Sequence, residues 1–137
     1  MGSVGSDAAA VLVGMPEFVV GAAVEEDGEV WVLIETPAAV TGCPGCGTRA
    51  QSKGRRRTKV RDLECGGRPV VVVWAKRRWR CPDPDCEVRT WTEQVQSIAP
   101  RAVLTERARY EVFRLIGEEG RSTAEVARSF GVAWGTA

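Results

Sequence analysis

The chain has 137 residues, of which 44% are hydrophobic and 27% charged, and this balance is typical of a soluble globular protein with one domain or two very small ones. No hydrophobic run approaches the length of a membrane span and no cleavable signal opens the sequence, which disfavours a membrane or secreted protein. The absence of histidine removes the usual general base of an enzyme and leaves cysteine as the only soft metal ligand.

The net charge of +1 hides a strong segregation of charge along the chain. Residues 1–48 contain seven acids and no base, whereas residues 49–80 contain twelve bases and two acids. A merely solvated surface normally interleaves both signs. So concentrated a positive block predicts a polyanionic partner, of which nucleic acid is the commonest.

The first structured segment is a predicted β-hairpin. Residues 17–24 and 29–35 are rich in valine, and Asp27-Gly28 between them is typical of a tight hairpin turn. In the second strand Trp31 and Leu33 alternate with further apolar residues. We therefore expect this strand to be buried on both sides, or nearly so.

Two cysteine pairs follow, Cys43 with Cys46 and Cys81 with Cys86, each spaced to close a tight loop around a metal. Four thiolates suit tetrahedral Zn²⁺, so we predict one structural zinc ion. Disulfides, a redox Cys-x-x-Cys motif and an iron–sulfur cluster are the alternatives; the odd count of five cysteines and the basic stretch after the first pair argue against the first two. Cys65 is interpreted as a strand-end residue without a role.

Two strands are predicted between the cysteine pairs, over residues 55–63 and 69–80, with a turn at Gly66-Gly67. The period-two pattern places four cations of the first strand on one face, where they would repel unless a partner neutralises them. A hairpin between two metal-binding loops is the layout of a zinc ribbon. The candidate phosphate-binding residues are Arg55, Arg56, Arg57, Lys59, Arg61, Lys76, Arg78 and Arg80.

Two tryptophans lie among these cations. Trp79 shares a strand face with Cys81, which favours a core or zinc-shielding role. Trp74 is left open between a core residue and a platform for a base or sugar.

The period changes after Pro100. Thr105 is expected to cap a helix through about Glu119, and Ser122 a second helix through Phe130. Gly131 would be the turn of a helix-turn-helix whose recognition helix only begins at Ala133, with a plain helical hairpin as the alternative. The residues expected to place this motif on DNA are Arg121, Ser122, Thr123, Trp134 and Thr136.

Together these patterns predict an α+β fold: an N-terminal β-hairpin and a four-cysteine zinc ribbon, followed by a short helical segment. The expected division is an arm over residues 1–15, the hairpin and ribbon over 16–99, and a helix-turn-helix over 100–137, cut off at the start of its recognition helix.

The order of motifs resembles the N-terminal region of insertion-sequence transposases of the ISL-three type, over about residues 11–137. The resemblance rests on Cys-Pro-x-Cys-Gly, on Gly54-Arg55-Arg56-Arg57, on Arg77-Arg78-Trp79-Arg80-Cys81 and on Thr90-Trp91-Thr92-Glu93. It implies a zinc-binding domain and a helix-turn-helix that recognise terminal inverted repeats, and a separate downstream domain that cuts and joins DNA. It carries over the four zinc cysteines and the basic strand but no catalytic residue.

We therefore expect a bacterial, cytoplasmic and nucleoid-associated protein that binds double-stranded DNA at transposon ends with weak specificity, without membrane, small-molecule substrate or catalysis of its own. A zinc-ribbon module for protein interaction or dimerisation, with the acidic hairpin as its docking surface, is the alternative. A homodimer and an RNA ligand are left open.

Overall fold

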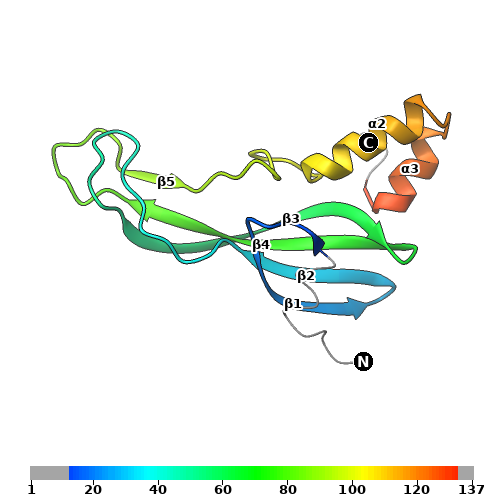
Figure 1. Ribbon diagram of the computed structural model, residues 1–137, viewed down its shortest axis with the longest axis horizontal. Coiled ribbons are helices and arrows are strands. Elements are labelled where there is room, and N and C mark those ends of the chain that lie inside the picture. The colour runs from blue at the N-terminus through cyan, green and yellow to red at the C-terminus, as the bar shows by residue number, and fades with distance from the viewer. Residues whose placement is uncertain (1–12, 133–137) are drawn as a thin grey trace.

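The computed structural model describes residues 13–132. Within these residues five strands and two helices are arranged along one long β-hairpin (Figure 1). The predicted fold class, α+β with a four-cysteine ribbon, is confirmed. The elements are β1 (Val19–Glu26), β2 (Glu29–Glu35), β3 (Gln51–Cys65), β4 (Arg68–Arg80), β5 (Thr90–Thr92), α2 (Glu106–Gly117) and α3 (Thr123–Phe130).

The strands form one sheet in the order β1-β2-β4-β3. Both predicted hairpins are present, and residues 30–34 of β2 pair in parallel with residues 70–74 of β4, which joins them. The short strand β5 pairs with the last residues of β4. Strand β4 therefore has neighbours on both sides along most of its length.

Both hairpin turns lie at the glycine-containing pairs that predicted them in the sequence. Asp27 and Gly28 have φ values of 54° and 77°, and Gly66 and Gly67 have 58° and 78°. Two consecutive residues with positive φ make the turn whose twist matches that of the flanking strands. The second turn allows β3 and β4 to continue as a hairpin much longer than β1 and β2.

One side of the sheet, called here the core face, carries the main hydrophobic core. Trp74 is 1% exposed and meets the ring of Phe18 edge-on, with 5.7 Å between the ring centroids. Trp74 is thus a core residue. The sheet residues of this core are Val20, Val32, Ile34, Val60, Val70, Val72 and Trp74.

The opposite side, the outer face, corrects one expectation from the sequence. Trp31 and Leu33 of β2 are only half-buried, whereas Val32 and Ile34 on the core face are buried. The strand is therefore not buried on both sides. Its outer apolar residues are covered in part by long side chains from β3, because Lys59 lies over the Trp31 ring with its Nζ 5.1 Å from the ring centroid.

The two helices form a second, smaller core at the turn end of the long hairpin. Thr105 caps α2 by accepting a hydrogen bond from the Ala108 amide, and Ser122 caps α3 in the same way from Glu125, as predicted. Helix α2 ends at Gly117, two residues before the expected end. Neither described helix is long and apolar enough to span a membrane.

A buried carboxylate attaches the helices to the sheet. Asp62 of β3 is 3% exposed and accepts hydrogen bonds from Thr105 Oγ1 at 2.7 Å and from Arg107 Nε at 2.9 Å. This contact raises the pKa of Arg107, and the backbone beside it is also paired, since the Arg61 amide donates to the Val103 carbonyl. The start of α2 is therefore fixed to β3 by both side chain and backbone.

Replacing Asp62 by Ala should destabilise the protein by about 2 to 3 kcal/mol, because Arg107 would lose its buried partner and Thr105 its acceptor. Denaturant unfolding of the zinc-loaded protein measures this loss. Glu64→Ala is the control, since this carboxylate on the same strand is exposed and its loss should cost less than about 0.5 kcal/mol. Equal effects of the two substitutions would show that Asp62 does not anchor the helices.

Candidate zinc centre and basic surface

The first cysteine pair lies in a tight loop just before β3. The Cys43 amide donates to the Thr48 carbonyl and the Gly47 amide to the Cys43 carbonyl, each at 2.8 Å, while the Gly45 amide lies 3.4 Å from Cys43 Sγ. Gly47 has a φ of 77°, which favours glycine. These bonds turn the loop so that both sulfurs point to one side.

The second pair begins where β4 ends. Cys81 directly follows Arg80, and its amide donates to the Arg89 carbonyl at 3.0 Å. Asp83 holds the loop between the cysteines, because its side chain accepts from the Asp85 amide at 2.9 Å and its carbonyl from the Cys86 amide at 3.2 Å. The strand and this turn together position the second pair of thiols opposite the first.

The four sulfur atoms have the arrangement that a zinc ion requires. Cys43 Sγ lies 3.7 Å from Cys86 Sγ, and Cys46 Sγ lies 3.6 Å from Cys81 Sγ. All four sulfurs lie within 4.8 Å of one another. Tetrahedral Zn²⁺ with Zn–S bonds of about 2.3 Å separates its sulfurs by about 3.8 Å. The residues present therefore fit one Zn²⁺ with four thiolate ligands, which would leave no position for water.

The thiols differ in how readily they ionise without a metal. Cys46 Sγ lies 3.1 Å from Thr48 Oγ1, and its hydrogen bonds with the side chain and backbone of Thr48 lower the pKa of Cys46 to about 7. Burial raises the pKa of Cys81, and it raises that of Cys86 to about 12. Because a coordinating cation deprotonates its thiols, bound Zn²⁺ would convert Cys81 and Cys86 from the protonated thiol to the thiolate. Cys81 and Cys86 thus favour the thiolate form only together with a metal.

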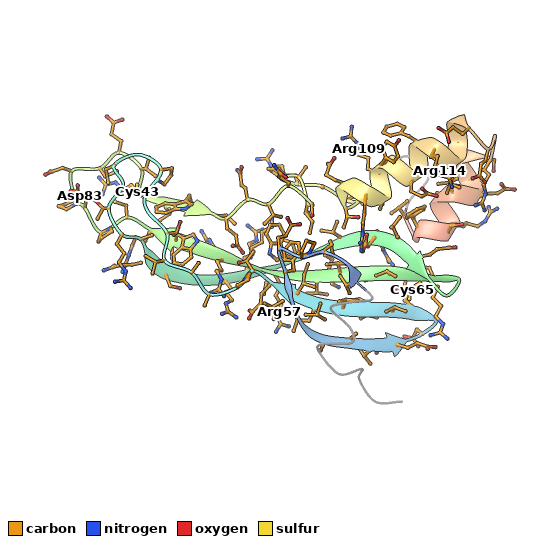
Figure 2. All side chains as sticks on the ribbon, viewed as in Figure 1. Cys43, Arg57, Cys65, Asp83, Arg109 and Arg114 are labelled. Atoms are coloured by element: carbon orange, nitrogen blue, oxygen red, sulfur yellow. The ribbon has the colours of Figure 1, made fainter. Side chains whose placement is uncertain are left out.

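The fifth cysteine takes no part in the cluster. Cys65 is exposed at the end of β3, beside the turn that is farthest from the cysteine loops (Figure 2). None of the cysteines, all of which lie within residues 13–132, forms a disulfide. The interpretation of Cys65 as a strand-end residue agrees with this position.

Residues 39–86 match the family model described as the zinc-finger of transposase IS204/IS1001/IS1096/IS1165. This segment is a zinc-ribbon region of the ISL-three transposase type. The match includes both cysteine pairs and the long hairpin between them, and it indicates a transposase-related DNA-binding role. No curated protein and no solved structure matches the chain.

On the outer face of the ribbon, several predicted phosphate-binding residues are occupied within the chain. Arg55 pairs with Glu35 at 2.5 Å and Arg61 with Glu29 at 2.7 Å. Lys59 lies between these pairs, over Trp31. The hairpin of β1 and β2, called here the acidic hairpin, thus neutralises part of the basic strand. Its carboxylates are the partner that the row of cations on β3 was expected to need.

Arg61 is the most enclosed of these cations. Its side chain is 24% exposed, and a Cβ added to Gly131 at the end of α3 would lie 3.0 Å from Arg61 Nη1. Gly131 has a φ of 69°, so it both ends the helix and lets the guanidinium approach. Arg61 therefore stabilises the junction between the sheet and the helices.

A different set of cations is left available on the core face. Beyond Trp74 the apolar positions of β4 give way to Lys76, Arg78 and Arg80 at the same alternation, and Arg56 pairs in register with Lys76. None of these four has a carboxylate partner within residues 13–132. Arg80 donates to Gln51 Oε1, and Lys76 Nζ lies 4.8 Å from the centroid of the Trp74 ring. We call Arg56, Lys76, Arg78 and Arg80 the basic stripe.

The sequence did not reveal the role of Arg77, which lies on the outer face among these cations. Its side chain donates to the Thr36 carbonyl at 2.9 Å, and its amide donates to Glu93 Oε1 at 2.8 Å. Thr36 in turn donates to the other oxygen of Glu93 at 2.7 Å. This network fixes the segments that follow β2 and β5 to β4 near its C-terminal end. In the sequence, the motif Thr-Trp-Thr-Glu ending at Glu93 was the one feature that pointed to this network.

The residues expected to place the helical segment on DNA are only partly described. Arg121 and Ser122 are exposed, and Thr123 begins α3. Trp134 and Thr136 lie outside the described residues. The helix-turn-helix stays a prediction, because the family match ends at Cys86 and the residues expected to form its third element lie outside the described range.

Replacing Cys81 by Ser should abolish stable zinc binding, because three thiolates and a hydroxyl form a much weaker site than four thiolates. Structural zinc sites contribute on the order of 10 kcal/mol, so the ribbon should also lose its protection from proteolysis. Metal analysis after dialysis should give one zinc per chain for the unaltered protein and for Cys65→Ser, and almost none for Cys81→Ser. Zinc retained by Cys81→Ser would contradict the four-cysteine site.

Proposed function

We propose that this chain is the DNA-binding region of a transposase, which holds the terminal inverted repeats of its element through the zinc ribbon and a helix-turn-helix. The observation that carries the proposal is the zinc-ribbon match combined with a basic stripe that is not neutralised within the described chain. In this role the protein is nucleoid-associated in a bacterial cytoplasm. Cutting and joining of DNA belong to another part of the transposase.

The stripe suits a duplex because its cations follow one strand at regular intervals. Lys76, Arg78 and Arg80 lie at alternate positions of β4, so successive charges are about 6 to 7 Å apart, close to the spacing of phosphates along one DNA strand. The zinc site lies at the end of this strand and holds the stripe in place. Zinc therefore supports DNA binding without contacting DNA.

The cysteine loops and the helices lie at opposite ends of the long hairpin (Figure 1). A duplex lying along the hairpin would meet the stripe at one end and α2 and α3 at the other. Phosphate contacts supply affinity, whereas base readout falls to the recognition helix expected from Ala133 onward.

The alternative, an interaction module that docks through its acidic hairpin, has less support. Three of the hairpin carboxylates, those of Glu25, Glu29 and Glu35, already pair with arginines of the same chain. A surface whose charges are satisfied internally attracts a basic partner only weakly. We therefore favour DNA as the ligand.

Replacing Arg78 by Gln should weaken duplex binding, and it should reduce the slope of log affinity against log salt by about 1, because one phosphate contact is lost. Arg68→Gln is the control: it removes the same charge, but this guanidinium pairs with Glu25 at the far end of the hairpin. A salt titration of binding to a duplex by fluorescence anisotropy measures both slopes. Equal effects would show that only net charge matters.

Base specificity of the ribbon should be weak. We expect less than about 4 kcal/mol of discrimination between an inverted repeat and a random duplex, the low end for a specific site. Competition at one fixed salt concentration measures the difference. Stronger discrimination would require base contacts from the ribbon itself, and absence of duplex binding at low salt would favour the interaction module.

A further inference from the structure

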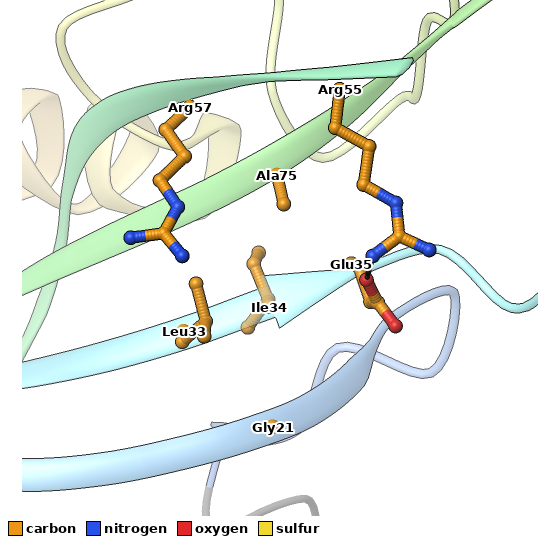
Figure 3. A pocket seen from close by; sticks show the side chains of 7 residues that line it. All are labelled: Gly21, Leu33, Ile34, Glu35, Arg55, Arg57 and Ala75. Carbon is orange, nitrogen blue, oxygen red and sulfur yellow. Dashed lines mark hydrogen bonds and ion pairs between the residues drawn. The ribbon is translucent and has the colours of Figure 1, made fainter.

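One cation of the outer-face row differs from its neighbours. Arg55, Lys59 and Arg61 each reach across β4 to a partner on β2, namely Glu35, Trp31 and Glu29. Arg57 reaches toward Leu33, an aliphatic side chain that cannot satisfy a guanidinium (Figure 3). Within residues 13–132 Arg57 has no hydrogen-bond or ion-pair partner. The row therefore lacks one acceptor at this position.

Arg57 borders a hollow of about 310 Å³ on the outer face. Small residues make the space: Ala75 lies between the two arginines, and Gly21 forms the far side at a bulge in β1. The guanidinium groups of Arg55 and Arg57 flank the hollow, and Glu35 holds that of Arg55 (Figure 3). The site thus has a fixed and an unpaired guanidinium above an apolar floor.

This combination selects the chemistry of a ligand. A free guanidinium binds a phosphate oxygen pair in a planar fork, and the unpaired Arg57 offers this fork. The floor of Leu33 and Ala75 offers no hydrogen bond, so it suits a carbon-rich group such as a deoxyribose. The hollow is large enough for the phosphate and sugar of one nucleotide but not for a duplex.

We propose that this hollow is a binding site for a single nucleotide phosphate, with the phosphate on Arg57 and the sugar against Leu33 and Ala75. The site lies on the opposite face of the sheet from the basic stripe and is independent of duplex binding there. The phosphate comes either from a free nucleotide or from a single-stranded stretch of DNA, which share this chemistry. The proposal does not require the proposed function to hold.

The test uses the zinc-loaded protein and thymidine 5′-monophosphate as the probe, followed by the amide NMR signals of Gly21 and Ala75. Arg57→Gln should weaken binding at least about tenfold, because a charge-assisted contact is lost. Arg56→Gln is a matched control: it is the adjacent residue and removes the same charge, but on the core face. It should change nucleotide affinity less than about twofold while weakening duplex binding.

A second variant tests the shape of the site without changing its charge. Gly21→Ala should weaken nucleotide binding by narrowing the hollow, and the substitution is compatible with the fold, because a Cβ there would lie an ordinary 3.7 Å from Leu33 Cδ2. The proposal is overturned if Gly21→Ala binds the probe normally, if Arg56→Gln weakens binding as much as Arg57→Gln, or if thymidine without phosphate binds equally well.

Two further ligands separate the sources of the phosphate. The dinucleotide dTpdT carries only an internal phosphodiester, so binding as tight as that of the monophosphate supports single-stranded DNA as the ligand. Binding of the monophosphate alone supports a free nucleotide. Inorganic phosphate that competes as strongly as the monophosphate would overturn the assignment of the apolar floor to a sugar. Failure of duplex binding in the same protein would count against the proposed function alone.

Discussion

The far half of the long hairpin depends on the four cysteines, because it has no hydrophobic core of its own. Along β4 the core residues end at Trp74, and the positions that continue the same face are cations. Two strands that carry mainly charged side chains are marginal in water without such a core. Zinc bound by Cys43, Cys46, Cys81 and Cys86 would close this end by linking the loop before β3 to the end of β4. The metal thereby allows a charged surface to be held rigidly, which a hydrophobic core at the same place would cover.

The two faces of β3 use their cations differently: two on the outer face pair with carboxylates of the same chain, and the core face leaves its cation without a carboxylate among the described residues. On the outer face Arg55 and Arg61 are paired with carboxylates of the acidic hairpin, so they contribute to the packing of β2 against the ribbon. On the core face Arg56 has no such partner among the described residues, and it extends the basic stripe. Neighbouring residues of a strand point to opposite sides, so a sequence reading Arg-Arg-Arg supplies both faces at once. The segregation of acids and bases along the chain therefore reflects ion pairs between β2 and β3 as well as a surface suited to a polyanion.

Local patterns predicted most of the elements, and pairing between distant segments accounts for what they missed. Asp27-Gly28, Gly66-Gly67, Thr105 and Ser122 each determine a turn or cap through their own side chain or backbone, so the sequence placed both hairpins and both helices. The cysteine spacing likewise predicted a site that the geometry fits. Nothing local indicates that β2 pairs in parallel with β4, and without that pairing neither the Arg55–Glu35 contact nor the burial of Trp74 can be predicted. The division of 16–99 from 100–137 stays a prediction, and the contacts of Asp62 with Thr105 and Arg107 cross it.

These contacts fix the two ends of the molecule relative to each other. Strand β4 runs without interruption from the turn beside the helices to Cys81, and Asp62 fixes the start of α2 to the adjacent strand. The helices and the zinc site are therefore joined by a twisted two-stranded ribbon and not by a flexible linker. Two binding surfaces at a fixed separation engage one duplex together only when their spacing matches the helical repeat of DNA, and then the second contact costs little further entropy. In the DNA-binding role proposed above, a rigid ribbon would convert weak phosphate contacts into a requirement for correct spacing along the duplex, even where no single base is read.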